Sequence, residues 1–162
     1  AAQVPPPPDA TVLDAGCGLG AGLAALRRAY PHARLEGVEW SWPLALAARW
    51  RCRFGAVRAT VRRGDMWAGD WRGCALVYLF QRPESLPRAV AKARDELHDG
   101  AWLASLEFEA LELRPQAVLR GSDGRPVWLY RAPFAAAGAR PAGSRRDRGP
   151  SQVSPRGADK SG

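Results

Sequence analysis

Residues 11–22 constrain the fold of this chain more than any other segment. They read Thr-Val-Leu-Asp-Ala-Gly-Cys-Gly-Leu-Gly-Ala-Gly, a short apolar run that ends in Asp14 and is followed by alternating Gly16, Gly18 and Gly20. Glycine permits tight turns and lacks the Cβ atom that would block a ligand. A strand, a glycine turn and a helix in this order are typical of nucleotide-type cofactor loops. The segment therefore predicts an α/β fold with a cofactor beyond its first strand.

This loop fits two classes of cofactor, and the position of Asp14 distinguishes them. Gly16, Gly18 and Ala21 match the G-x-G-x-x-G/A pattern of dinucleotide sites, in which the helix N-terminus carries a pyrophosphate. A carboxylate at the end of the first strand would repel that anion. S-adenosylmethionine has no phosphate, and a nearby carboxylate would favour its ammonium group. We therefore favour S-adenosylmethionine over a dinucleotide, with a glycine turn that binds nothing as the third alternative.

The hydrophobic pattern predicts alternating strands and helices followed by a hairpin. We expect strands at 11–15, 35–39, 57–61, 75–80 and 102–108, and helices at 20–30, 41–54 and 84–98. The turn signal Ser122-Asp123-Gly124 lies between two further strands at 117–119 and 126–131. We predict a Rossmann-like three-layer α/β sandwich, with a mostly parallel seven-stranded sheet closed by an antiparallel C-terminal hairpin.

Composition divides the chain into three parts. Residues 1–9 form a proline-rich lead-in, residues 10–134 hold the folded domain, and residues 135–162 lack periodicity and are expected to be disordered. The net charge is +8, but about half of this excess lies in the tail. Nucleic acid is therefore disfavoured as the substrate.

The cysteines and the hydropathy bound the cellular context. Cys17, Cys52 and Cys74 form no C-x-x-C pair, which argues against a disulfide framework and a zinc site. We expect no metal and a cytoplasmic location. No apolar run could span a membrane. The chain starts at Ala1, so we leave open an upstream membrane segment, with membrane association if the natural chain is longer.

Carboxylates at the ends of the second and third strands complete the candidate cofactor site. Glu39 could accept hydrogen bonds from both ribose hydroxyls. Asp65 could accept one from the adenine amino group, and Met66 or Trp67 could pack against the purine face. The order of Asp14, Glu39 and Asp65 along the strand ends gives each of them more weight than it has alone.

Together these motifs closely resemble class I S-adenosylmethionine-dependent methyltransferases over residues 11–134. The compact layout is similar to small bacterial methyltransferases, and also to lysine methyltransferases that act on mitochondrial membrane proteins. The Asp/Asn-Pro-Pro-Tyr signature of enzymes that methylate amino groups of nucleic acids is absent. The link from 108 to 117 is shorter than usual in the family, so one sheet face should be thinly covered. The resemblance implies S-adenosylmethionine as the cofactor, with contacts from Asp14, Gly16, Cys17, Gly18, Gly20, Glu39, Trp40, Asp65 and Met66.

Three further residues are candidates for the acceptor side. Gln81 and Arg82 follow the fourth strand and are expected to shape the acceptor pocket, while Glu107 would handle a cationic or amine group. An amine acceptor must lose its proton before it can react, so a nearby base helps. We expect a methyltransferase whose acceptor is unknown, either a protein (with lysine a candidate) or a small molecule. A non-catalytic module that binds S-adenosylmethionine and an NAD-dependent oxidoreductase are the alternatives.

Overall fold

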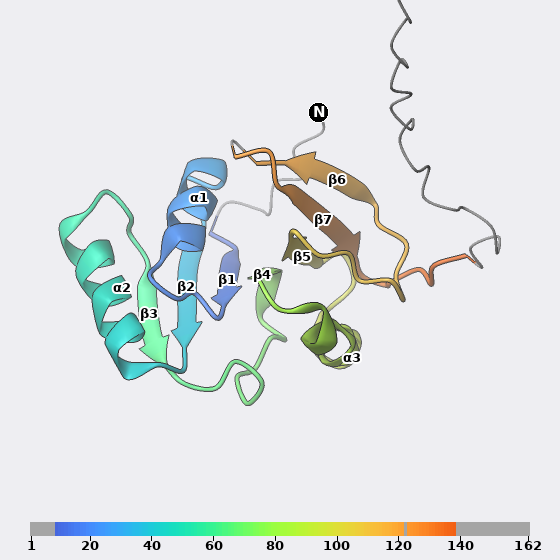
Figure 1. Ribbon diagram of the computed structural model, residues 1–162, viewed down its shortest axis with the longest axis horizontal. Helices are drawn as coiled ribbons and strands as arrows, with labels where there is room; N and C mark the ends of the chain where they lie inside the picture. Colours follow the sequence, from blue (N-terminus) through green and yellow to red (C-terminus); the bar gives the residue numbers. More distant parts are fainter. Residues whose placement is uncertain (1–8, 122, 139–162) are drawn as a thin grey trace, which may run out of the picture.

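The computed structural model describes residues 9–121 and 123–138, and this part of the chain is built on a seven-stranded sheet (Figure 1). The strand order is β3-β2-β1-β4-β5-β7-β6. β7 is antiparallel to β5 and β6, and the other neighbouring strands are parallel. The strands are β1 Thr11–Ala15, β2 Arg34–Glu39, β3 Thr60–Arg63, β4 Cys74–Leu79, β5 Trp102–Leu106, β6 Ala117–Arg120 and β7 Pro126–Arg131.

Helices cover both faces of this sheet. α1 (Ala21–Ala29) and α2 (Trp42–Phe54) contribute Leu23, Leu26 and Ala48 to the apolar cluster on one face. α3 (Leu86–Glu96), which follows the 3-10 turn η1 (Pro83–Ser85), contributes to the cluster on the other face. The predicted three-layer sandwich with its closing antiparallel hairpin is confirmed.

The chain order places the candidate site at the centre of the sheet. From β1 the chain moves to β2 and β3 on one side, and then returns to β4 and β5 on the other. In open α/β sheets, ligands bind beyond the carboxyl ends of the strands where the strand order reverses in this way. Here that point lies between β1 and β4, immediately beyond Asp14 and Ala15.

Among the strands, the third and the fifth differ from the sequence prediction by two residues or more at one or both ends. The third strand was expected at 57–61 but spans Thr60–Arg63, because it is an edge strand in which only Val61 is buried, which leaves little hydrophobic periodicity. The fifth strand was expected to reach 108 but ends at Leu106, because Glu107 adopts a φ of 71° that a strand cannot contain.

The link between β5 and β6, which was expected to leave one sheet face thinly covered, packs on the α3 side of the sheet although it contains no helix. The link between β5 and β6 buries Ala110 and Leu113 in the α3-side cluster, and the Ala110 amide donates to Tyr130 Oη at 2.8 Å. Residues 135–138 then return along this link, where Leu113 pairs with Ala136. The rest of the expected tail, 139–162, and the lead-in at 1–8 lie outside the described residues.

Candidate functional site

A cavity of about 420 Å³ lies at the carboxyl ends of β1, β2, β3 and β4. This volume is within the range of about 300–1,000 Å³ that is common for cofactor sites. Seven residues predicted from the sequence meet here, although they come from four different strand ends. The lining residues are Gly16, Val38, Glu39, Trp40, Gly64, Asp65, Met66, Trp67 and Gln81.

The glycine loop forms one wall of this cavity, and its shape requires glycine. Gly16, Gly18 and Gly20 have φ values of 87°, 51° and 81°, in the left-handed region that side chains disfavour. A Cβ atom at Gly16 would lie only 2.8 Å from Nε2 of Gln81. The amide of Gly16 donates to the carbonyl of Val38 at 2.9 Å, which fixes the loop against the end of β2.

Glu39 joins this loop to the start of α2. Its Oε2 accepts a hydrogen bond from the Gly18 amide at 2.9 Å, and its Oε1 accepts one from the Ser41 amide at 2.8 Å. Each carboxylate oxygen has a further acceptor position, because an ionised carboxylate offers about four lone pairs. Glu39 can therefore hold the loop and still accept from hydroxyl groups of a ligand.

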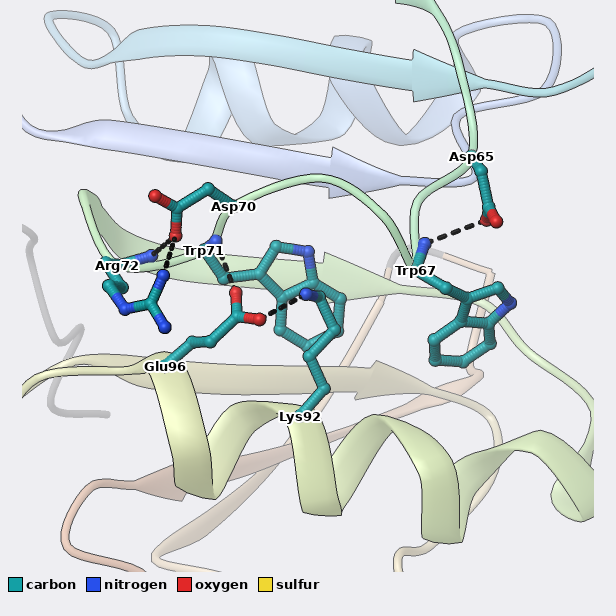
Figure 2. Close-up of polar contacts among 7 residues, drawn as sticks. All are labelled: Asp65, Trp67, Asp70, Trp71, Arg72, Lys92 and Glu96. Atoms are coloured by element: carbon teal, nitrogen blue, oxygen red, sulfur yellow. Dashed lines mark hydrogen bonds and ion pairs between the residues drawn. The ribbon is translucent and has the colours of Figure 1, made fainter.

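The loop between β3 and β4 supplies the opposite wall. Asp65 Oδ1 accepts from the Trp67 amide at 2.9 Å, as Figure 2 shows. The Trp67 ring is held from behind by Arg88 of α3, whose guanidinium carbon lies 4.4 Å from the ring centroid. Gln81 Nε2 donates to Met66 Sδ at 3.3 Å. This wall combines a carboxylate with aromatic and thioether surfaces that can pack against a flat heterocycle.

The same loop is anchored further along by α3. Glu96 Oε2 accepts from the Trp71 amide at 2.7 Å, and Lys92 both pairs with Glu96 and lies 5.1 Å from the centroid of the buried Trp71 ring (Figure 2). Partial burial acts to raise the pKa of Glu96, but the hydrogen bonds from Lys92 and Trp71 and nearby cations outweigh it and lower the pKa. Glu96 therefore stays ionised as a fixed anchor.

Asp14 faces the α1 side of the sheet and not the cavity at the strand ends. Its carboxylate is buried, and within the described residues its Oδ2 has no hydrogen-bond partner. Burial raises its pKa to about 7, although the Leu23 amide lowers it and Glu39 adds a small rise. Asp14 lines a second cavity of about 610 Å³, which lies between α1 and the β6–β7 hairpin. Gly16 and Gly18 of the glycine loop also line this second cavity.

Two of the residues predicted to contact the cofactor, Cys17 and Gly20, pack against the residues beneath the loop. The Cys17 thiol packs under Gly37, where an added Cβ atom would be 2.9 Å from Sγ. Burial and the nearby carboxylate of Asp14 raise the pKa of this thiol to about 12. Gly20 packs against Ala48 of α2. Cys17 and Gly20 thus shape the loop from below and do not line the 420 Å³ cavity.

The residues predicted for the acceptor side are only partly brought together. Gln81 lines the cavity, whereas the adjacent Arg82 is exposed at the start of η1. Glu107 is also exposed, and its Oε2 lies 3.7 Å from Nη1 of Arg125. Arg125 in turn lies over the ring of Phe80, at 5.6 Å from its centroid. Glu107 and Arg125 therefore form a charged rim beyond the end of β4.

The sequence prediction missed the supporting residues of the site. Arg88, Lys92 and Glu96 recur every fourth residue and lie along one side of α3, from which they hold the β3–β4 loop. That spacing is visible in the sequence, but it is also what any solvated helix face shows. Only the packing of α3 reveals their partners.

Within residues 9–121 and 123–138, there is no group of His, Cys, Asp or Glu side chains that could hold a metal, and no helix is long and apolar enough to cross a membrane.

The sheet order with its closing hairpin, and the glycine loop followed by acidic residues at the ends of β2 and β3, define the class I S-adenosylmethionine-dependent methyltransferases. Comparison with protein-family models names the family more closely. The chain belongs to the family described as the ANTKMT methyltransferase domain, whose model matches residues 14–117.

A curated relative supports the same class. The chain is 35% identical over 133 residues to the release factor glutamine methyltransferase of Geobacter sulfurreducens. This match covers 80% of the chain and 41% of the relative, so the chain spans less than half the length of that protein.

Solved structures show the same fold at low sequence identity. An RNA methyltransferase from Salinibacter ruber in complex with S-adenosyl-L-homocysteine has a TM-score of 0.68 and 22% identity, over 76% of this chain and 82% of the other. Geranyl diphosphate C-methyltransferase from Streptomyces coelicolor A3(2) has a TM-score of 0.61 and 16% identity, over 78% and 73%. The cofactor of the class is S-adenosylmethionine.

The residues of this chain fit that cofactor. The 420 Å³ cavity holds carboxylates from Glu39 and Asp65, which suit hydroxyl and amino donors, together with the aromatic face of Trp67. The missing Cβ atom at Gly16 leaves room for a ligand between the loop and Gln81.

Proposed function

We propose that this chain binds S-adenosylmethionine in the 420 Å³ cavity and transfers its methyl group to a nitrogen atom of a protein, with lysine as one candidate residue. The observation that carries the proposal is the meeting of Glu39, Asp65 and Gln81 around Gly16 in one cavity. Methyl transfer to a small molecule is the alternative. When bound, the cofactor supplies an electrophilic methyl group on a sulfonium centre.

Different residues of the cavity bind different parts of the cofactor. Glu39 accepts from the ribose hydroxyls through the lone pairs that the Gly18 and Ser41 amides leave free. Asp65 accepts from the adenine amino group, while Met66 and Trp67 pack against the purine. Asp14 lies behind the loop on the α1 side, and its carboxyl favours the ammonium end when it is ionised.

The acceptor reaches the cavity from the β4 side, where Gln81 lies. Gln81 Nε2 is already oriented by Met66 Sδ, so its amide is held for positioning an incoming group. Arg82 and Glu107 lie further out, and Glu107 would attract an amine and accept its proton before transfer. The curated relative is named as a methyltransferase of a release factor, which is a protein, and this name supports a protein acceptor here. The missing Asp/Asn-Pro-Pro-Tyr signature argues against amino groups of nucleic acids.

Calorimetric titration with S-adenosylmethionine, S-adenosylhomocysteine and NADH tests the cofactor. We expect micromolar binding of the first two, weakened about tenfold to a hundredfold in Asp65→Ala, because a hydrogen bond to a charged group contributes about 1.5–3 kcal/mol. Asp70→Ala is the matched control, since Asp70 lies in the same loop but pairs with Arg72 in solvent (Figure 2). Binding of NADH alone, or of none of the three, would contradict the proposal.

Transfer from methyl-labelled cofactor to candidate proteins, with the modified residue mapped by mass spectrometry, tests the acceptor. Glu107→Ala should lower turnover by about tenfold or more and leave cofactor affinity unchanged, because Glu107 lies outside the cofactor cavity. Glu112→Ala, an exposed carboxylate in the same link, is the control. Collapse of cofactor affinity in Glu107→Ala would refute its role, and binding without any turnover would indicate a non-catalytic module.

A further inference from the structure

The outward face of α2 is apolar and uncovered within the described residues. Trp42, Leu46, Trp50 and Phe54 follow one another at every fourth residue, and their exposed fractions are 60%, 39%, 63% and 70%. Trp50 and Phe54 form a ring pair with centroids 4.8 Å apart. The opposite face of the same helix is the one that packs on the sheet, through Ala45 and Ala48.

This pattern is unusual for a surface helix. A helix on the surface of a globular domain normally has one apolar face toward the core and a polar face toward water, and a helix that is apolar on both sides is normally buried on both. Large exposed apolar patches on soluble domains mark interaction sites. We refer to Trp42, Leu46, Trp50 and Phe54 as the aromatic stripe of α2.

Arginines border the aromatic stripe, and no acidic residue lies on α2. A shallow hollow between α2 and β3 is lined by Arg27, Arg34, Arg49, Arg53 and Arg58, and its lining contains no acidic residue. Arg53 belongs to both features, because it lines the hollow and its guanidinium lies 5.9 Å from the Phe54 ring centroid. Figure 1 shows α2 and β3 together at one outer edge of the molecule.

We propose that this edge docks on an anionic membrane surface, with the aromatic stripe in the headgroup boundary and the arginine hollow on lipid phosphates. Tryptophan and phenylalanine are favoured at the membrane interface, and basic residues beside an apolar helix face strengthen binding to anionic lipids. Arginine side chains can also extend their charged ends toward phosphates while their stems stay in apolar surroundings.

The shape and chemistry of this edge favour lipid over other partners. The stripe contains the aliphatic Leu46 beside its aromatic rings, and aliphatic surface contributes little to binding stacked bases and phosphates. A self-associating face would place the border arginines of two copies near one another, where like charges repel. A bilayer with anionic headgroups matches both the apolar stripe and the positive border.

Sedimentation with phosphatidylcholine vesicles, with and without phosphatidylglycerol, tests the proposal on the full chain. We expect binding that requires phosphatidylglycerol and weakens at high salt. The double variant Trp50→Ser with Phe54→Ser should lower the partition coefficient about tenfold or more. Arg53→Gln with Arg58→Gln should lower it by a similar factor, because each basic residue near an anionic surface strengthens binding.

Matched control variants test whether vesicle binding depends on this edge in particular or on exposed apolar and basic residues in general. Leu111→Ser with Val118→Ser removes exposed apolar side chains elsewhere, and Arg94→Gln with Arg114→Gln removes exposed arginines outside this edge. Both double variants should bind vesicles as the wild type does. Quenching of wild-type tryptophan fluorescence by brominated lipids gives a readout that needs no substitution. Absence of vesicle binding or of quenching would overturn the proposal. The proposal would also be overturned if the chain dimerised or bound RNA and did not bind vesicles, and if substitution of the aromatic stripe abolished that dimerisation or RNA binding.

Discussion

Two acidic residues of the site have opposite environments, although both lie at the carboxyl ends of adjacent strands. Glu39 accepts two backbone hydrogen bonds and lines the cavity. Asp14 is buried under the first turn of α1, and an added Cβ atom at Gly22 would lie 2.4 Å from its Oδ2. The alternation of β1 determines this difference, because it directs Val12 and Asp14 to the α1 face and Leu13 and Ala15 to the other.

The buried carboxyl of Asp14 predicts a pH-dependent stability. Since its pKa in the folded chain is about 7, above the ordinary value of 3.8, the native state binds more protons than the unfolded state between these values. Stability from this group is full below about pH 4 and is lost as the pH rises through 7. Asp14→Asn should therefore gain a few kcal/mol of unfolding free energy over wild type at pH 8, at about 1.4 kcal/mol per pKa unit.

Urea unfolding of Asp14→Asn and wild type at pH 5 and pH 8 measures this gain. Asp70→Asn, which changes an exposed aspartate, should follow the wild type at both pH values. A stability difference between Asp14→Asn and wild type that does not grow with pH would contradict the buried state of this carboxyl and its raised pKa.

For Glu39 we expect the reverse: its substitution should lower both the stability of the fold and the affinity for the cofactor. In Glu39→Gln the side-chain NH₂ must face either the Gly18 or the Ser41 amide, and two donors cannot pair. We expect unfolding free energy to fall by about 1–3 kcal/mol and cofactor affinity to fall about tenfold. Thermal melting and calorimetry measure these losses. Glu36→Gln on the same strand should change little, because Glu36 pairs with Arg62 at the surface.

At the scale of elements, the site depends on one helix that does not line the cavity. α3 holds the β3–β4 loop at three points, through Arg88 on Trp67 and through Lys92 and Glu96 on Trp71. Asp65 and Met66 belong to this loop, so the geometry of the 420 Å³ cavity depends on how firmly α3 anchors the loop. The β6–β7 hairpin supplies the other external support, since its Arg125 lies over Phe80 at the end of β4.

Substitution of the Glu96 anchor should therefore affect a cavity that Glu96 does not contact. Glu96→Gln leaves Lys92 without its ion pair and weakens the hydrogen bond to the Trp71 amide, so we expect a loss of about 1–3 kcal/mol in unfolding free energy. Cofactor affinity should fall several-fold as the loop loosens, and calorimetry detects this.

The neighbouring exposed Asp95 offers a matched control for this anchor. Asp95→Asn should leave both the melting temperature and cofactor affinity close to wild type. If Glu96→Gln lowered stability with unchanged cofactor affinity, α3 would have a structural role only.

Across the whole molecule, the sheet is protected at its centre and exposed at both edges. β1 and β4 are buried between helices or packed link residues, whereas β3 has a single buried residue and β6 has none. The 610 Å³ cavity lies on the α1 side, between that helix and the hairpin. The arginines of β3 discourage edge-to-edge pairing of sheets.

This gradient predicts the order of hydrogen exchange. Amides of β1 and β4 should exchange last, because they open only with global unfolding, and those of β6 should exchange first through local opening. Exchange followed by mass spectrometry of peptides from each strand tests this order. Equal protection of β6 and β1 would show that the hairpin is stabilised by something beyond the described contacts.

The sequence by itself determined the class of fold and most of the residues that line the 420 Å³ cavity. Strand ends can be located from local patterns, and a parallel sheet brings its carboxyl ends to one edge, so Gly16, Glu39 and Asp65 could be expected together. Gln81 followed from the same argument. The short, exposed β3 was misplaced because an edge strand with one buried residue carries almost no periodic signal.

Only the tertiary structure decided which side chains face the cavity and what supports them. Asp14 and Cys17 are in the predicted motif, yet their side chains point to the α1 face and the core. The alternation of β1 directs Asp14, and the turn of the chain at Gly16 directs Cys17. The anchors on α3 and the uncovered stripe of α2 depend on which elements pack together. Such contacts join residues far apart in the chain, and helical spacing alone shows neither a partner nor its absence.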